Sequence, residues 1–323
     1  AVAFARGKAA PIGTGVVVVN TNLAYENGEA AGTGMVLTSS GEVLTNNHVI
    51  NGATTIRVVV PGTGRSYAAT VAGYDRTEDV AVLRLKGASN LATVSTDTSP
   101  LTVGQAVTAL GNAGGTGTLT TAPGSVTGLG KSIVASDESG VSERLTGLIE
   151  TDANVQPGDS GGPLLDADGD VVGMDTAASA GFGFQNASST DAYAIPIARA
   201  LAIARQIEAG KASATVHIGA TAFLGVEVRA VETTGYGYGY GSGSPTATGS
   251  LIAGVVDGGP ADRAGLVAGD VIVAINGRTV TTPTVITTVL QTKKPGMRVA
   301  IRYVDQLGVT RTVSVKLGSG PPQ

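Results

Sequence analysis

Cysteine and tryptophan are absent from this chain of 323 residues, and only two histidines, His48 and His217, are present. The absence of cysteine excludes a thiol nucleophile, a disulfide framework and cysteine-ligated metal sites. Two histidines so far apart in the sequence do not favour a histidine-rich metal site either. We therefore expect neither a bound metal nor another cofactor.

Basic blocks and long apolar runs are also missing. The net charge is −4, and no cluster of lysine and arginine stands out, which argues against a nucleic-acid surface. No apolar run approaches the roughly 18 residues that would span a bilayer, so no membrane span is expected. The chain begins at Ala1 without a methionine, as a form whose signal peptide has been removed would. We therefore expect a secreted or cell-envelope protein.

Glycine is abundant, with 48 residues, whereas aromatic residues make up only 4% of the chain. Strand-forming residues between glycine-rich turns predict a mainly β protein. Before the first long helical pattern, two sets of about six short strands predict a pair of packed β-barrels. That helical pattern covers Ile197–Ala209, where apolar residues recur at helical spacing and Gly210 follows.

The stretch Gln156–Leu164 places Ser160 between glycines, with an aspartate before it and a Gly-Gly-Pro turn after it. Glycines let the backbone bend tightly and let two N–H groups point the same way. A serine hydroxyl beside such N–H groups combines a nucleophile with an oxyanion hole, the two parts that acyl transfer needs. The alternative is a glycine-rich hairpin with an incidental serine, because these residue types are all common in turns.

A base and an acid for this serine are present in the first half of the chain. His48 follows a predicted strand and is the only histidine before Ser160, which makes it the single candidate base in this half. The alternative is a core histidine whose hydrogen bonds are satisfied. Asp79 ends an acidic cluster and directly precedes an apolar strand, so we expect it to be partly buried. Asp75 and Glu78 of the same cluster are expected in a solvated loop.

A second unit follows the helix, and its strands, with one helix predicted over Thr284–Gln291, indicate an α+β fold. The glycine- and tyrosine-rich segment 235–243 within it is of low complexity and is expected to be a flexible connector. The predicted boundaries are a β-barrel unit at 1–209, a linker at 210–218, the second unit at 219–317 and a disordered tail at 318–323.

The order His48, Asp79, Ser160 on two β-rich halves matches the chymotrypsin type. Over essentially its whole length the sequence resembles the HtrA/Deg serine proteases, with the likeness strongest to secreted actinobacterial members. The resemblance rests on four motifs: Thr45–Ile50, Asp79–Leu83, Thr151–Leu164 and Tyr193–Pro196. It implies a chymotrypsin-like double β-barrel followed by one PDZ domain.

The resemblance also implies the role of each residue in the barrel unit. Ser160 would be the nucleophile, and His48 the base that accepts its proton and returns it to the leaving amine. Asp79 would orient His48 and stabilise its charged form. The backbone N–H groups of Gly158 and Ser160 would bind the oxyanion.

In the second unit, Phe223, Leu224, Gly225 and Val226 resemble the loop with which PDZ domains bind a peptide carboxylate. Backbone N–H groups of that loop hold the C-terminus while the peptide adds a strand to the sheet edge. Polypeptide substrates and C-terminal peptides are therefore the expected partners. The family's trimer contacts use N-terminal aromatic residues, and only Phe4 represents them here, so the resemblance leaves a homo-trimer open.

The resemblance implies a preference for small aliphatic P1 residues, and Val155, Thr176 and Ala178 are of the type to line a modest apolar S1 pocket. Asp191 lies two residues before Tyr193, so in a continuous strand both would face the pocket side. A lysine or arginine P1 side chain would then pair with a carboxylate that is costly to bury alone. In the alternative, which we favour, the strand begins only after Asp191 and its carboxylate lies in solvent.

Together these features predict a secreted serine endopeptidase of HtrA type that cleaves unfolded or misfolded polypeptides in protein quality control, with PDZ-assisted peptide capture. The rival hypothesis is a non-proteolytic peptide-binding chaperone or adaptor, in which the β unit is a scaffold. The complete set of His48, Asp79 and Ser160 disfavours that rival.

Overall fold

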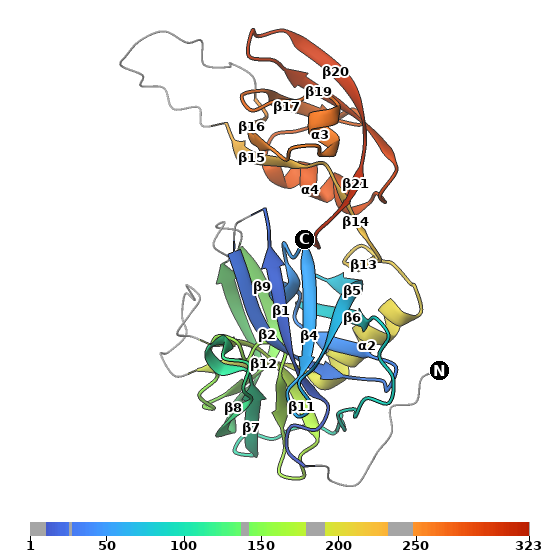
Figure 1. Ribbon diagram of the computed structural model, residues 1–323. Helices are drawn as coiled ribbons and strands as arrows, with labels where there is room; N and C mark the ends of the chain where they lie inside the picture. Colours follow the sequence, from blue (N-terminus) through green and yellow to red (C-terminus); the bar gives the residue numbers. More distant parts are fainter. Residues whose placement is uncertain (1–10, 26–27, 137–141, 179–190, 232–247, 323) are drawn as a thin grey trace. The chain divides into compact units, whose positions relative to one another are not determined.

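The computed structural model describes residues 11–25, 28–136, 142–178, 191–231 and 248–322. Phe4 and the predicted connector 235–243 lie outside these residues. The chain divides into two compact units, Ala1–Gly219 and Ala220–Pro322, and Figure 1 shows their elements coloured along the sequence.

Six strands of the first unit close into a barrel, because β5 pairs with both β4 and β6 in the order β5-β4-β1-β2-β3-β6. All of these pairs are antiparallel. The strands are β1 (Val16–Leu23), β2 (Gly28–Val36), β3 (Glu42–Thr45), β4 (Thr55–Val60), β5 (Arg65–Asp75) and β6 (Val80–Leu85).

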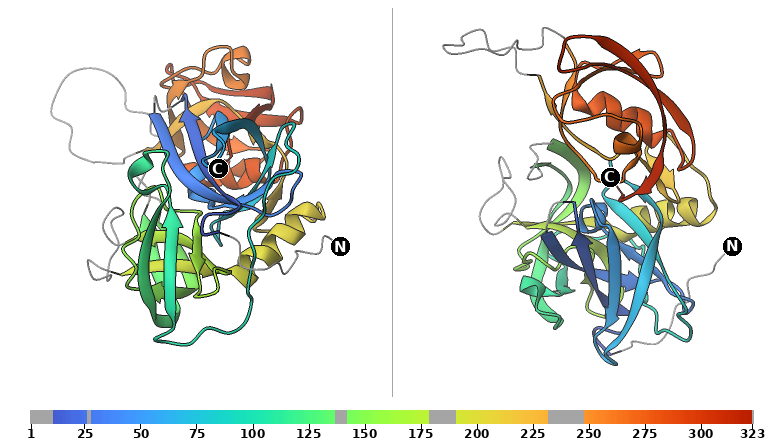
Figure 2. Two further views of the ribbon diagram at one scale, coloured as in Figure 1. Left: turned by 60° about the horizontal axis from the view of Figure 1, so that its bottom comes forward. Right: turned by 45° about the horizontal axis from the view of Figure 1, so that its top comes forward.

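A second closed barrel follows in the order β10-β11-β12-β9-β8-β7. A 3₁₀ turn, η1 (Ala113–Gly115), comes directly after β7 in the chain. Figure 2 shows the first barrel in blue and the second in green, side by side. The predicted mainly β fold with two packed barrels is confirmed. The strands are β7 (Ala106–Gly111), β8 (Thr120–Ser136), β9 (Ser142–Thr151), β10 (Pro163–Leu165), β11 (Val171–Ala178) and β12 (Ala192–Pro196).

Each barrel has an apolar interior, and a third apolar core lies between the barrels. The strand periodicity of two explains this arrangement. In β12, Ala192 and Ala194 belong to the interior of the second barrel, whereas Tyr193 and Ile195 belong to the shared core. The shared core also takes Met35 and other residues of the first barrel. It therefore fixes the barrels to one another and positions whatever lies at their junction.

Helix α2 (Ile197–Glu208) completes the shared core, and the predicted helix over this stretch is present. Its buried residues recur at helical spacing on one face. The chain then enters β13 (Val216–Ile218), which pairs with β5 of the first barrel. Residues 210–218, predicted to be a linker, therefore include an ordered strand in the structure. The partner of that strand lies about 140 residues earlier in the chain. The buried residues of α2 are Ile197, Ala200, Leu201, Ile203, Ala204 and Ile207.

The second unit holds a sheet in the order β15-β16-β17-β19-β20, with β18 beside β17 and a separate β14–β21 pair. Helix α4 (Pro283–Gln291) packs its apolar face into the core of this unit. The predicted tail 318–323 differs from the structure, because it contains β21, which pairs with β14. The other elements are β14 (Thr221–Phe223), β15 (Val226–Ala230), β16 (Ser250–Val255), α3 (Pro260–Arg263), β17 (Val271–Ile275), β18 (Arg278–Thr279), β19 (Arg298–Val304), β20 (Thr310–Lys316) and β21 (Gly318–Gly320).

Candidate active site

An imidazole and a carboxylate meet at one end of the first barrel. His48 lies in α1 (Asn47–Ile50), a single turn that follows β3, and Asp79 directly precedes β6. The Nδ1 atom of His48 lies 2.8 Å from Oδ2 of Asp79, and the backbone N–H of His48 donates to Oδ1 at 2.9 Å. Because an ionised carboxylate only accepts, Nδ1 carries the proton of the neutral ring. The ring nitrogen that can accept a further proton is therefore Nε2.

Asp79 adopts an uncommon backbone conformation, with φ at +54°. Residues other than glycine rarely enter this left-handed region, although aspartate and asparagine tolerate it best. The N–H of Asp79 donates to the carbonyl of Arg76 at 3.2 Å, and the side-chain Nδ2 of Asn46 donates to the carbonyl of Asp79 at 2.9 Å. The acid is thus tied to the segment that carries His48, so the two side chains are positioned together.

The turn that carries Ser160 is bonded to the first barrel through Thr33 of β2. The N–H of Thr33 donates to the carbonyl of Ser160 at 2.8 Å, and its hydroxyl donates to the carbonyl of Gly158 at 2.8 Å. The same hydroxyl accepts the N–H of Asn112 at 2.9 Å. Thr33 is fully buried, so water does not compete for these hydrogen bonds. They fix the position of the second barrel relative to the first.

Gly161 brings the Ser160 turn against the segment that leads into His48. Its φ is +84°, and a Cβ at this position would clash with the hydroxyl of Thr45 and lie 3.2 Å from the N atom of Asn46. Only glycine fits there, because both the backbone angle and the space exclude a side chain. The structure therefore brings the predicted nucleophile, base and acid to one place at the junction of the barrels.

The N–H groups of Gly158 and Ser160 have no hydrogen-bond acceptor among the residues that the structure describes. The N–H of Asp159, which lies between these two residues, donates to the carbonyl of Gln156 at 3.0 Å. Gly158 has φ at +101°, and a Cβ here would clash with the carbonyl oxygen of Asn112. Two unused N–H groups next to a serine are what an oxyanion hole requires.

Two further carboxyl groups are buried behind this turn. Asp159 is 3% exposed, and its Oδ2 accepts the N–H of Gln156 at 2.9 Å, while its Oδ1 has no partner among the described residues. Burial raises the pKa of Asp159. Asp175 of β11 is 0% exposed, and neither of its carboxyl oxygens has a partner among the described residues. Burial, with the charge of Asp159 as a second cause, raises the pKa of Asp175 well above its ordinary value.

The residues predicted to line the S1 pocket have different surroundings in the structure. Val155 is buried among the core residues of the second barrel. The hydroxyl of Thr176 donates to Oδ2 of Asp79 at 2.5 Å, a contact that crosses between the barrels and was not predicted. Ala178 lies opposite Ala192 in the β11–β12 pair, and its side chain lies outside the described part of the structure.

Asp191, the fourth predicted pocket residue, is half-buried and directly precedes β12, which begins at Ala192. Nearby, the hydroxyl of Tyr193 donates to Oε1 of Glu150 at 3.3 Å, and Nζ of Lys131 lies 2.9 Å from Oε2 of Glu150. Burial first, and then the charges of Glu150 and Asp191, raise the pKa of Tyr193 to about 12. The sequence reasoning missed Glu150 and Lys131, because their proximity to Tyr193 depends on the strand register.

Asp75 corrects one prediction about the acidic cluster. It is 2% exposed rather than solvated, and its Oδ2 accepts the hydroxyl of Thr215 at 2.7 Å. Its Oδ1 accepts the N–H of Glu78 at 3.2 Å, and Glu78 is itself paired with Arg199 of α2 at 3.2 Å. The burial follows from β13, which covers the end of β5 with residues far along the chain.

The predicted carboxylate-binding loop of the second unit joins β14 to β15. Phe223 ends β14, Val226 begins β15, and between them lie the buried Leu224 and Gly225, whose φ is +80°. The N–H groups of Leu224 and Gly225 have no acceptor among the described residues. β15 is the first strand of its sheet, so among the described strands its outer edge pairs with no other.

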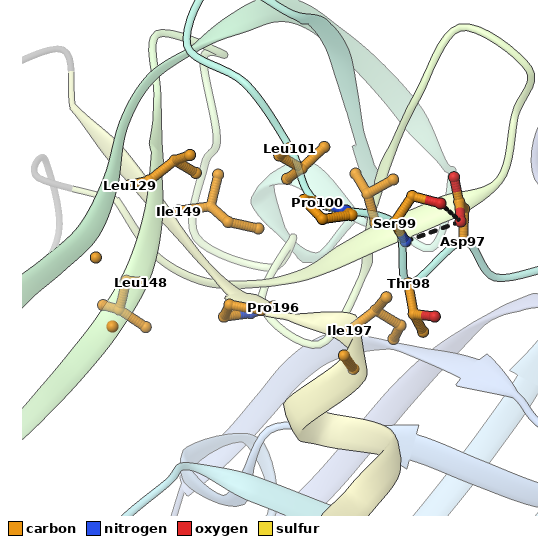
Figure 3. A pocket seen from close by; sticks show the side chains of 14 residues that line it. Asp97, Thr98, Ser99, Pro100, Leu101, Leu129, Leu148, Ile149, Pro196 and Ile197 are labelled. Atoms are coloured by element: carbon orange, nitrogen blue, oxygen red, sulfur yellow. Dashed lines mark hydrogen bonds between the residues drawn. The ribbon is translucent and has the colours of Figure 1, made fainter.

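A pocket of about 250 Å³ lies elsewhere in the second barrel, beside the start of α2. Figure 3 shows apolar side chains such as Leu129, Leu148 and Ile197 around it. At one end, the carboxylate of Asp97 accepts the N–H of Ser99 at 2.9 Å and its hydroxyl at 2.7 Å. No residue predicted for the active site lines this pocket, which therefore belongs to the surface of the barrel rather than to the site.

In the part of the chain that the structure describes, no group of three or more histidine, cysteine, aspartate or glutamate side chains could hold a metal ion. The described helices include none that is long and apolar enough to cross a membrane.

Two family models match the chain. Residues 32–174 match the trypsin-like peptidase domain, and residues 251–302 match the PDZ domain. The first match contains His48, Asp79 and Ser160, and the second begins after the loop 223–226.

Curated relatives and solved structures agree with these matches. Serine protease PepD of Mycobacterium tuberculosis is 34% identical over 325 residues, which cover 96% of this chain and 65% of PepD. The putative serine protease HhoA of Synechocystis sp. is 32% identical, covering 90% of this chain and 67% of HhoA. The structure of the HtrA-type protease AlgW with tripeptide is 28% identical, with a TM-score of 0.53 and coverage of 96% of this chain and 95% of that one. The chain thus spans about two thirds of the length of these two curated relatives, and it belongs to the HtrA-type serine proteases, with a trypsin-like peptidase domain followed by a PDZ domain.

Proposed function

We propose that the chain is a serine endopeptidase that cleaves unfolded polypeptides through an acyl-enzyme, with Ser160, His48 and Asp79 as its triad. The observation that carries this proposal is the junction of the barrels, where the paired His48 and Asp79 of one barrel lie against the Ser160 turn of the other. Neither barrel holds the complete set of groups, so the site exists only in the packed pair.

In the first half of the reaction, Oγ of Ser160 attacks the carbonyl carbon of the scissile bond, and its proton passes to Nε2 of His48. The carbonyl oxygen becomes negative and is bound by the N–H groups of Gly158 and Ser160. The C–N bond then breaks, the amine leaves with the proton from His48, and the acyl group stays on Ser160 as an ester. Asp79 remains ionised and stabilises the charged imidazole in between.

In the second half, water attacks the ester carbon and gives a proton to His48. The ester bond breaks, the carboxylic product leaves, and the proton returns from His48 to Oγ of Ser160. The hydrogen bond from Nδ1 of His48 to Asp79 is kept in both halves of the reaction. Nε2 of His48 is the atom that accepts the proton and then donates it.

The second unit supports capture of the substrate by its C-terminus. The free N–H groups of Leu224 and Gly225 are suited to a carboxylate, and the open edge of β15 is suited to an added strand. Val226 and Val228 of β15 and Val285 of α4 are partly buried apolar side chains at the core beside that edge. Apolar C-terminal residues are therefore the proposed ligands of this unit.

An extracytoplasmic location is part of the proposal. Relatives in Haemophilus influenzae and Chlamydia pneumoniae are named as probable periplasmic serine proteases. A protease that acts on unfolded chains is compatible with such a compartment, where its substrates are proteins that have failed to fold.

Hydrolysis of casein by the parent chain and by Ser160→Ala tests the triad. We expect the variant to lose at least about 10³-fold in rate, since removal of the nucleophile leaves only the binding groups. Ser66→Ala is the matched control, because Ser66 is an exposed serine of β5 whose hydroxyl accepts a hydrogen bond from Arg57. Thermal unfolding of each protein establishes that the fold is kept.

Retention of more than about a tenth of the parent rate in Ser160→Ala would rule out the triad assignment. If the parent itself hydrolyses nothing but suppresses aggregation of an unfolded protein, the non-proteolytic chaperone or adaptor hypothesis replaces the endopeptidase.

Titration of the Ser160→Ala chain with one peptide, as free acid and as C-terminal amide, tests the PDZ site. We expect the amide to bind at least about tenfold more weakly, a difference of about 1.4 kcal/mol. Equal affinities of the two forms would mean that Leu224 and Gly225 do not bind a carboxylate.

A further inference from the structure

The strand residue Asp175 is bonded on both sides to the Ser160 turn. Its N–H donates to the carbonyl of Gly162 at 2.8 Å, and its carbonyl accepts the N–H of Gly161 at 2.8 Å. The following residue, Thr176, donates its hydroxyl to Asp79. The backbone of Asp175 therefore connects the nucleophile turn of one barrel to the acid of the other.

The side chain of Asp175 has no such connections. It is 0% exposed, and neither carboxyl oxygen meets a donor among the described residues. An ionised carboxylate in such a place costs several kcal/mol, because it loses its hydration and gains no hydrogen bond. A protonated carboxyl is neutral and avoids most of that cost.

The charges around Asp175 also favour the proton. The charge that acts on its carboxyl is that of Asp159, which comes from the Ser160 turn and has the same sign when ionised. The neighbours across the two strand pairs, Gly162 and Ala194, are uncharged. Helix α2 also packs against β11, and its charged residues are Arg199, which pairs with Glu78, Arg205 and Glu208.

We propose that Asp175 is a positioning residue that keeps the Ser160 turn in its working geometry only while its carboxyl is protonated. Ionisation draws the carboxyl toward water, and the strand that carries it is bonded to Gly161 and Gly162. Hydrolysis therefore falls at alkaline pH through Asp175. This inference rests on the proposed function, because it assigns a control to the same site.

The pH dependence of kcat and KM on a small peptide substrate tests the inference in the parent and in Asp175→Asn, which mimics the neutral acid in shape. We expect kcat of the parent to fall about tenfold or more as the pH rises through the ionisation of Asp175, with KM little changed. In Asp175→Asn the fall over the same range is less than about threefold. Asp168→Asn is the control, since this exposed acid lies in the turn between β10 and β11 and its variant should keep the parent's profile.

Thermal unfolding supplies a readout that needs no turnover. The folded pKa of Asp175 is raised, so its stabilisation is complete below the ordinary pKa of aspartate and is lost as pH rises through the folded value. The melting temperature of Asp175→Asn, relative to that of the parent, should therefore increase as the pH rises. In the parent alone, infrared spectroscopy at neutral pH should show the carbonyl band of a protonated carboxylic acid that disappears together with activity.

Parallel pH profiles in the parent and Asp175→Asn overturn the inference, as does the lack of a protonated-acid band at neutral pH. If instead the parent hydrolyses nothing at any pH, the proposed function fails. The infrared and unfolding results still report on Asp175 in that case, so the two failures are distinguishable.

Discussion

The two barrels each bury acids near Ser160, but the hydrogen-bond donors around those acids differ. In the first barrel, Asp79 is 4% exposed and accepts bonds from the backbone and ring of His48 and from Thr176. In the second, Asp159 and Asp175 are equally buried, and most of their carboxyl oxygens meet no donor among the described residues. Donors stabilise a charge, whereas burial without donors stabilises a proton. The acid of the first barrel thus lies among donors, whereas burial almost without donors raises the pKa of the two acids of the second barrel.

Asp79→Asn removes the negative charge from the acid of the first barrel and has the largest expected effect. Asparagine tolerates the positive φ of Asp79, so the turn is kept. Its amide group cannot both accept from Nδ1 of His48 and stabilise a charged ring, and we expect kcat to fall about 10⁴-fold. Peptide hydrolysis measures the effect, with Asp168→Asn as the control. A loss of less than about tenfold would show that the charge of Asp79 is not needed.

Thr176→Val removes the donor that the second barrel gives to Asp79. A buried carboxylate that loses one charge-assisted bond is destabilised by about 1.5–3 kcal/mol, and we expect kcat to fall about tenfold. Denaturant unfolding and peptide hydrolysis measure the two effects. Thr176→Ser keeps the hydroxyl and should stay within about threefold of the parent rate. Equal losses in both variants would mean that packing, not the bond to Asp79, accounts for the effect.

Asp191→Ala tests whether Asp191 selects the P1 residue of the substrate. This acid directly precedes β12 and lies half-buried near Tyr193. Because β12 begins after Asp191, we expect its carboxylate to play no part in P1 selection and the rates to change by less than about twofold. Mass spectrometry of cleavage products from a denatured protein gives the P1 residues. Cleavage after valine, alanine and similar residues, unchanged in the variant, is the expected result. Cleavage after lysine or arginine that disappears in Asp191→Ala would place the carboxylate in the pocket.

Glu78→Gln should have the smallest effect. The pair of Glu78 with Arg199 is 3.2 Å long, but about a third of each side chain is exposed, at 37% and 33%. Exposed ion pairs contribute about 0–1 kcal/mol and are screened by salt. We expect unfolding free energies of the parent and variant to agree within about 0.5 kcal/mol, and to converge further at high salt. A larger loss would indicate that the end of the first barrel depends on this charge.

The sequence was sufficient to propose His48, Asp79 and Ser160 as the candidate set, because each lies in a short motif whose residue types suit that chemistry. It was also sufficient for the two barrels and for helices such as α2, since strand and helix periodicities are local signals. It was not sufficient for Asp75, whose burial depends on Thr215, 140 positions away along the chain. Strands β13 and β21 were missed for the same reason, because each is only three residues long and depends on a remote partner.

Thr176 shows the same limit within the site. Thr176 was predicted only as a residue of the S1 pocket, because the contact of its hydroxyl with Asp79 depends on how the two barrels pack. The sequence also could not predict that the carboxyl oxygens of Asp175 lack a partner among the described residues, because no sequence pattern indicates a missing hydrogen bond. Long-range packing, rather than local preference, decides these positions.

The bond between Thr33 and Gly158 joins residues 125 positions apart. Such contacts form slowly, because the chain loses the entropy of a long closed loop before the contact stabilises it. The groups around Ser160 therefore come together only when the two barrels pack, and an unfolded chain holds Ser160 and His48 apart.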